Sequence, residues 1–256
     1  MAIGKTKAQR RMAFKTMVRR LMTSAALGVV IVASLYLYNF LTTTEKLAIG
    51  HVEFTGLSRV DGAEMARLVA DLEGQNILLV PLEQYSARFN GHPRVRRAEL
   101  KRILPDRIVC TVEEREPVAL VFAGNFHEVD EDGMIMPSDD LTELLDLPII
   151  SGLDSDAVRE GKRCREPRLM AALSTLAICK RYGGSFAGNI SELRLGRSGI
   201  NVVSLKEGMV LLLGDGQVER RLKKFFVLRN KISEEDTGAR FVDLRFDDQI
   251  VLRSGI

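Results

Sequence analysis

The sequence contains no tryptophan, only three histidines and only three cysteines among its 256 residues. His51, His92 and His127 are scattered, and none has a histidine or cysteine three or four positions further on, so the spacing of a zinc site is missing. The cysteines are an odd set. On one continuous helix Cys164 and Cys179 would lie about 22 Å apart, far beyond disulfide reach. We therefore expect no metal site and three packed free thiols.

Motifs of the common enzyme classes are also missing. There is no Gly-x-Ser-x-Gly elbow, Ser-x-x-Lys pair, His-Glu-x-x-His helix, dinucleotide loop or Walker loop. Gly214-Asp215-Gly216 lacks the lysine or third glycine of a nucleotide loop and predicts a helix-opening turn capped by Asp215. Asp130-Glu131-Asp132-Gly133 lacks the later ligands of a calcium loop and predicts a turn. These absences favour a binding protein with no cofactor and no small-molecule substrate over an enzyme.

Acidic residues are absent from the first 20 positions, which carry seven lysines and arginines. Leu21–Leu41 then runs 21 residues without a charge, which as a helix spans about 30 Å, the thickness of a bilayer core. A core helix is seldom apolar on every face for this length, and a cleaved signal peptide has a shorter apolar run and a small-residue cleavage site. We expect residues 1–20 to be a cytoplasmic basic tail and residues 21–41 a single transmembrane helix.

The net charge of +3 comes from this tail. Of the 37 lysines and arginines, 30 follow position 20, against all 34 acidic residues. The rest of the chain is therefore mildly acidic, which argues against nucleic acid as a partner.

Residues 46–116 have the pattern of a small α+β unit. Ser58-Arg-Val-Asp61 fits a capping box before the first helix, and Leu104-Pro105-Asp106 is a turn sequence. The expected order is strand, helix, helix, strand, strand. These elements are a strand in Lys46–Thr55, a helix through Met65–Leu72 closed by Gly74, a helix from Pro81 to Phe89, and strands at Val95–Ile103 and Arg107–Glu113.

This unit, directly behind a membrane anchor, resembles a POTRA domain, and more narrowly that of the FtsQ/DivIB bacterial division proteins. Glu113-Glu114-Arg115-Glu116-Pro117 is the most specific part, because such an acid-Arg-acid-Pro run ends the POTRA strand in that family. Pro81, where an acidic residue is common, and Phe246, where tyrosine is common, depart from the pattern. The further matching segments are Val52–Gly56, Gly74–Leu78, His92–Val95, Leu104–Asp106 and Val118-Ala119.

Residues 117–253 are expected to form a mixed β-sheet domain with two helices. In Phe241–Arg253, Val242, Leu244 and Phe246 alternate with Asp243 and Arg245, so one face should be buried. Only three residues follow Arg253, which predicts a C-terminal edge strand. The other elements are strands at Val118–Phe122, Phe126–Val129, Leu147–Ile150, Ile190–Leu195, Gly199–Ser204 and Met209–Leu213, a helix at Pro167–Tyr182 and a helix after Gly216.

The resemblance implies an inner-membrane scaffold of the division complex, with its N-terminus cytoplasmic and its folded domains periplasmic. It implies FtsB and FtsL-type proteins as partners, and septal peptidoglycan synthases as indirect ones. We expect capture by β-strand addition at the C-terminal edge. For Phe246 a place in the core is the alternative. The partner-binding residues carried over from the family, with the neighbouring edge residue Val251, are Arg245, Phe246, Asp248, Gln249, Val251 and Leu252.

Two other readings stay open at this point. A periplasmic envelope enzyme would need a deep pocket, and a POTRA-bearing transport porin would need many alternating barrel strands. A Gram-positive DivIB-like protein usually has a longer cytoplasmic part and a tail after the last strand. Both features are missing here, which favours a host with two membranes.

A basic cluster in the POTRA-like unit is either a solvated face or a docking surface for acidic partners or lipid head groups. It consists of Arg94, Arg96, Arg97, Lys101, Arg102 and Arg107.

Overall fold

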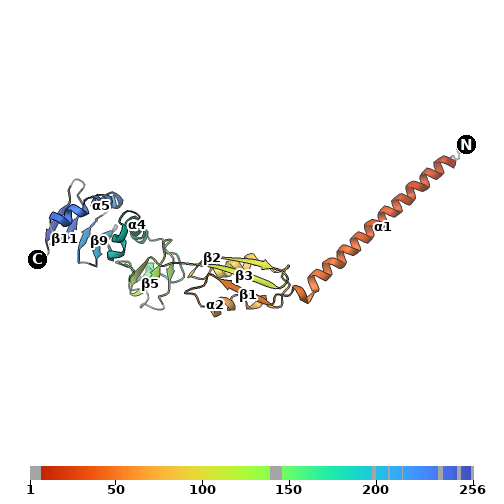
Figure 1. Ribbon diagram of the computed structural model, residues 1–256, viewed down its shortest axis with the longest axis horizontal. Coiled ribbons are helices and arrows are strands. Elements are labelled where there is room, and N and C mark those ends of the chain that lie inside the picture. Colours follow the sequence, from red (N-terminus) through yellow and green to blue (C-terminus); the bar gives the residue numbers. More distant parts are fainter. Residues whose placement is uncertain are drawn as a thin grey trace. The chain divides into compact units, whose positions relative to one another are not determined.

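The computed structural model describes residues 7–138, 146–197, 200–206, 208–214, 216–235, 239–246 and 249–254. The chain divides into two compact units (Figure 1). The first is Met1–Arg88 with Ala98–Val112, and the second is Phe89–Arg97 with Glu113–Ile256. Helices and strands do not alternate regularly along the chain, which confirms the expected α+β class.

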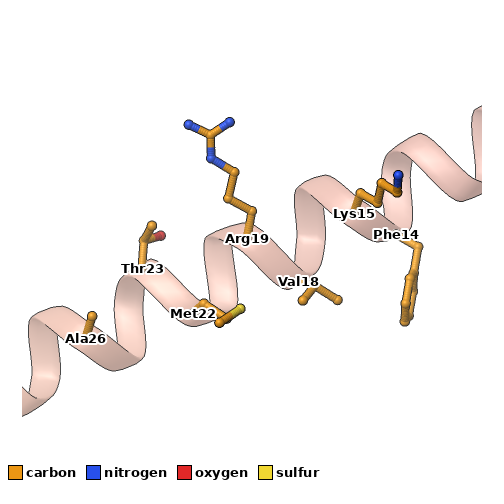
Figure 2. A pocket seen from close by; sticks show the side chains of 7 residues that line it. All are labelled: Phe14, Lys15, Val18, Arg19, Met22, Thr23 and Ala26. Atoms are coloured by element: carbon orange, nitrogen blue, oxygen red, sulfur yellow. The ribbon is translucent and has the colours of Figure 1, made fainter.

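The N-terminal helix α1 (Lys7–Thr43) is one unbroken helix in Figure 1. Its segment Met17–Thr43 is long and apolar enough to cross a membrane, and the most apolar 18-residue stretch within it has a mean hydropathy of 1.9 and is not buried in the protein. The helix also continues into the basic tail. Figure 2 shows Arg19 and Thr23 on one side of α1 and Phe14 and Val18 on the other.

The first unit contains a three-stranded sheet in the order β1-β3-β2. β1 runs parallel to β3, with Val52 opposite Ile108, and the two helices between them make the crossover that parallel strands require. The expected strand-helix-helix-strand-strand order is confirmed. The elements are the short 3-10 helix η1 (Glu45–Leu47), β1 (His51–Thr55), α2 (Gly62–Arg67), the 3-10 helix η2 (Ala70–Leu72), α3 (Leu82–Asn90), β2 (Val95–Ile103) and β3 (Arg107–Glu114).

The first helix of this unit differs from the expectation at both ends. Asp61, not Ser58, is its N-cap, and the Asp61 carboxylate accepts a hydrogen bond of 2.9 Å from the backbone N–H of Ala63. The helix ends at Arg67, and the chain leaves helical geometry at Val69 before η2. A six-residue helix forms few internal hydrogen bonds, so packing contributes most of its stability. Met65 and Leu72 are both fully buried, one in α2 and the other in η2.

The second unit is built on a nine-stranded sheet in the order β12-β11-β10-β9-β8-β7-β4-β5-β6, as far as the described residues show. The sheet is mixed, since β7 runs parallel to β4 and β8, and β10 runs parallel to β11. β6 was not expected, because two residues are too few for alternation to be seen. The strands are β4 (Ala119–Ala123), β5 (Asn125–Val129), β6 (Ile135–Met136), β7 (Ile149–Ser151), β8 (Ile190–Leu195), β9 (Ile200–Leu205), β10 (Val210–Leu212), β11 (Ala239–Asp243) and β12 (Val251–Ser254).

Two of the parallel connections in this sheet are made by helices. α4 (Pro167–Tyr182) connects β7 to β8, and α5 (Val218–Glu235) connects β10 to β11. They pack against each other, and Phe186, Phe225 and Phe226 pack beside them with ring centroids 5.2 to 5.8 Å apart. Two short 3-10 helices complete the described elements, η4 (Ser155–Ala157) and η5 (Gly184–Asn189).

All three cysteines are buried and free. Burial raises the pKa of the Cys110 thiol to about 11 and that of Cys179 to about 12. The Cys164 thiol donates to the carbonyl oxygen of Ala157 at 3.3 Å. The interpretation as packed free thiols is therefore confirmed.

Candidate partner-binding edge

β12 is the last strand of the large sheet. It pairs antiparallel with β11, with Leu252 opposite Val242 and Val251 opposite Asp243. In the described part of the chain no strand pairs with its other side. One row of β12 backbone N–H and C=O groups is therefore open to a further strand, as the sequence predicted for an edge.

The side chains of the last segment divide between the core and solvent. Leu252 and Ile250 pack against the hydrophobic core. Val251 is partly buried, whereas Gln249 and Arg253 are exposed. Leu252 thus fixes β12 to the domain while the open backbone edge and Gln249 remain accessible.

Arg245 follows β11 and is held by Asp243. Its Nε and Nη2 donate to the two carboxylate oxygens at 2.9 and 2.6 Å, and its backbone N–H donates to Oδ1 at 3.1 Å. The Asp243 side chain is 1% exposed and that of Arg245 is 51% exposed. The hydrogen bonds from Arg245 hold the pKa of Asp243 below its ordinary value against the opposing effect of burial, and they raise the pKa of Arg245 in return.

Arg221 of α5 holds the same turn from another side. Its Nη1 donates to the carbonyl oxygen of Leu213 at 2.6 Å, and its Nη2 donates to that of Arg245 at 3.2 Å. Gly214 lies close by, with a φ of +64°, and a Cβ there would approach Cγ of Arg245 to 2.9 Å. The end of β10, α5 and the chain after β11 are thus joined in one network.

Two expectations about this segment need correction. Alternation put Asp243 on the face opposite the buried one, yet Asp243 is fully buried because Arg245 neutralises it within the fold. Phe246, by contrast, is 45% exposed rather than buried with Val242 and Leu244, because the chain has left β11 by that point.

The predicted partner-binding residues therefore lie along one segment. Arg245 and Phe246 follow β11, Gln249 precedes β12, and Val251 and Leu252 are within it. Asp248 lies outside the described residues. Sequence reasoning missed Asp243 and Arg221 as supporting residues, since an acid in a strand and a base on a charged helix face carry no signal of their buried partners.

Within the described residues, no group of three His, Cys, Asp or Glu side chains is placed to hold a metal ion, and the hollows on α1 are open to solvent. Hollows of about 490 and 580 Å³ lie on the surface of α1, and each is lined by that helix alone. Figure 2 shows the residues that line the first of them. One helix has no second wall with which to enclose a substrate. A smaller groove of about 190 Å³ lies between β1 and the segment Ala66–Glu73.

The basic cluster is largely engaged within the protein. Arg102 donates to the carbonyl oxygens of Ile77 and Val80, which fastens the loop before α3. These contacts favour an internal role over a docking surface for the arginines concerned. The other pairs are Arg94 with Glu128 at 3.0 Å, Arg96 with Glu131 at 2.9 Å and Arg107 with Glu53 at 3.0 Å.

An apolar helix of membrane-spanning length, a POTRA-like unit and a mixed sheet with an open last strand together define a class of proteins with a membrane-type helix followed by folded domains. Comparison with known families identifies two matches. The POTRA domain of FtsQ type matches residues 47–115, and the C-terminal domain of the cell division proteins FtsQ and DivIB matches residues 119–245. The two matches take in most of the chain. The chain belongs to the FtsQ/DivIB family of cell division proteins.

Curated relatives agree with this assignment. A cell division protein FtsQ of Myxococcus fulvus is 28% identical over 206 residues, which cover 79% of this chain and 71% of the relative. One from a Geobacter species is 26% identical over 219 residues, covering 85% and 80%. One from an Anaeromyxobacter species is 27% identical over 201 residues, covering 78% and 68%. The membrane-type helix and the family together fit a bitopic membrane protein.

Proposed function

We propose that the chain is a non-catalytic scaffold of the division complex, anchored in the inner membrane by α1. The basic residues before Leu21 support a cytoplasmic N-terminus, because positive flanks are retained on that side. The folded parts of the chain that follow α1 then lie in the periplasm. The partners are FtsB and FtsL-type division proteins, through which the scaffold influences the septal peptidoglycan synthases.

The scaffold acts by β-strand addition at β12. The observation that carries this proposal is the position of β12 at the end of the sheet, with one side unpaired among the described residues. A partner segment laid along that side gains backbone hydrogen bonds, while exposed side chains beside it set the register. Leu252 in the core and the Asp243–Arg245 pair keep the edge in place before the partner arrives.

A proline scan of β12 tests the mechanism. On an antiparallel edge strand, successive N–H groups point alternately toward the neighbouring strand and away from it. Among Val251→Pro, Leu252→Pro and Arg253→Pro, the variants that lose an inward N–H lower the stability of the fold. A variant that loses only an outward N–H keeps the stability and loses a bond to the partner.

Partner capture is measured by co-purification of the detergent-solubilised full chain with an FtsB–FtsL-type pair. The expected result is that a proline variant of unchanged thermal stability captures about tenfold less partner, since one lost backbone bond and a distorted edge cost about 1.4 kcal/mol or more. Val227→Ala, an exposed site on α5, is the control and should capture normally. Full capture by every stably folded proline variant contradicts strand addition.

A further inference from the structure

Two loops of the first unit carry exposed apolar side chains. Leu78 and Leu79, between η2 and α3, are 42% and 58% exposed. Ile103 and Leu104, at the turn between β2 and β3, are 47% and 61% exposed. Among residues 44–112, all of which the structure describes, these four are the large apolar side chains left exposed. Exposed apolar side chains that gather in this way mark an interaction site more often than single ones do.

The first loop is bonded to the end of α1. The Asn76 side-chain Nδ2 donates to the carbonyl oxygens of Leu41 and Thr42, at 2.7 and 3.2 Å. The Oδ1 of the same side chain accepts from the backbone N–H of Leu78 at 2.9 Å. The last turn of the membrane-type helix and the backbone of the first exposed leucine are therefore bridged by one side chain.

The second loop is bonded to the first and to the segment that follows α1. Arg102, next to Ile103, donates from Nε to the carbonyl oxygen of Ile77 at 2.7 Å. The backbone N–H of Gly50 donates to the carbonyl oxygen of Asp106 at 2.9 Å. Both apolar loops are thus fixed at the end of the unit from which α1 leaves.

The length of α1 indicates what covers these side chains. The segment Met17–Thr43 rises about 40 Å as a helix, longer than the roughly 30 Å hydrocarbon core. Its last turn therefore reaches the head-group region, and groups bonded to Leu41 and Thr42 lie at that level. Apolar side chains held at that level are in direct reach of the lipid, so lipid is the ligand that the position of these side chains favours.

We propose that Leu78, Leu79, Ile103 and Leu104 form a membrane-contact patch, which dips into the surface of the bilayer from which α1 emerges. The patch gives residues 44–112 a second attachment to the membrane besides α1, and so limits their rotation about the end of that helix. This inference rests on the part of the proposed function that places α1 across the membrane. It is independent of partner capture at β12.

The absence of tryptophan from the sequence allows a clean test. The full-length Leu79→Trp variant and a matched control, Val227→Trp, are each reconstituted into phosphatidylcholine vesicles with and without lipid brominated near the top of its acyl chains. Val227 is 79% exposed on α5, so it controls for the affinity of tryptophan itself for interfaces. The expected result is blue-shifted emission quenched at least about twofold for Leu79→Trp, and water-like, unquenched emission for Val227→Trp.

Retention of the protein on vesicles after alkaline extraction separates the possible failures. Equal quenching of the two variants in retained protein overturns the patch alone. Release of the protein from the vesicles overturns both the anchor and the patch, while capture at β12 is read separately. Quenching that requires anionic phosphatidylglycerol contradicts an apolar contact and assigns binding to basic side chains instead.

A second variant shows whether the two loops act together. Leu104→Trp is quenched in the same vesicles, and adding Leu78→Ser and Leu79→Ser should reduce that quenching at least about twofold because the patch loses its other apolar half. Unchanged quenching in the triple variant overturns a shared patch.

Discussion

Arg94 and Glu128 form a buried bidentate ion pair, with Nη1–Oε2 and Nη2–Oε1 distances of 3.0 and 3.1 Å. Their side chains are 11% and 1% exposed, and Arg94 also donates to the carbonyl oxygen of Pro137 at 2.7 Å. Arg115 is buried as well, and its Nη1 donates to Oδ2 of Asp130 at 2.6 Å. Both arginines fall in the range matched by the POTRA family, yet both belong to the second compact unit. These pairs make the segments around Arg94 and Arg115 part of that unit.

Arg94→Met should destabilise the second unit by about 3–5 kcal/mol, because it removes the guanidinium charge that neutralises the buried Glu128 carboxylate. Urea unfolding of the detergent-solubilised chain, followed by circular dichroism, measures the change. Arg96→Met is the matched control, since Arg96 pairs with Glu131 in a half-exposed position and its loss should matter little. Equal stabilities of the two variants would show that the buried pair does not hold the fold.

Asp243→Asn should lower stability at neutral pH but not in acid. The pKa of Asp243 lies below its ordinary value, chiefly because Arg245 donates hydrogen bonds to the carboxylate. Its contribution is therefore fully present above the unfolded-state pKa of about 4 and is lost as the pH falls through the lower folded-state pKa. We expect a loss of about 1–3 kcal/mol at pH 7, from weakened bonds to a buried charge. Unfolding measured from pH 7 to pH 3 should show the difference shrinking below about pH 4, and a constant difference contradicts the assignment.

Gly56→Ala should be far more damaging than Gly74→Ala. Both glycines have positive φ, +85° and +79°. A Cβ on Gly56 would overlap the carbonyl oxygen of Val112, whereas one on Gly74 meets no atom within 4 Å. Gly74→Ala should therefore cost only the strain of its backbone, about 1–2 kcal/mol. Gly56→Ala should cost this and a steric displacement of β3 as well, and similar melting temperatures of the two variants would be inconsistent with the close approach.

Hydrophobic periodicity correctly predicted the long elements that have one apolar and one polar face. The bounds of α4 and β8 agree with the prediction residue for residue, because Leu169, Leu173 and Leu176 repeat at helical spacing and flanking glycines and prolines end the pattern. The sequence also predicted an edge position for the last strand, and β12 lies at the end of the sheet among the described residues.

Partners distant in the sequence were not predictable. In the sequence Asp243 has the pattern of a solvent-facing acid, but in the structure it pairs with Arg245. Arg221 has the pattern of a base on a charged helix face, but it donates a hydrogen bond to the carbonyl oxygen of Arg245. Arg94 was expected on a solvated face or a docking surface, yet it is buried and pairs with Glu128, 34 residues away in the sequence. Alternation predicts which side chains share a face of a strand. It does not predict which residues pack against that face, and the ion pairs described here depend on those residues.

Phe246→Ala should weaken partner capture without weakening the fold. Phe246 is 45% exposed between β11 and β12, so its truncation removes little buried area and should change stability by less than about 0.5 kcal/mol. An exposed aromatic ring beside an open edge is a typical anchor for a bound segment, and its loss should reduce capture about tenfold. Val227→Ala, an apolar truncation at a more exposed position on α5, should leave capture unchanged. Should Phe246→Ala capture the FtsB–FtsL-type pair as well as Val227→Ala does, the bound segment does not use this ring. A fall in melting temperature would instead show that the Phe246 ring contributes to the stability of the fold.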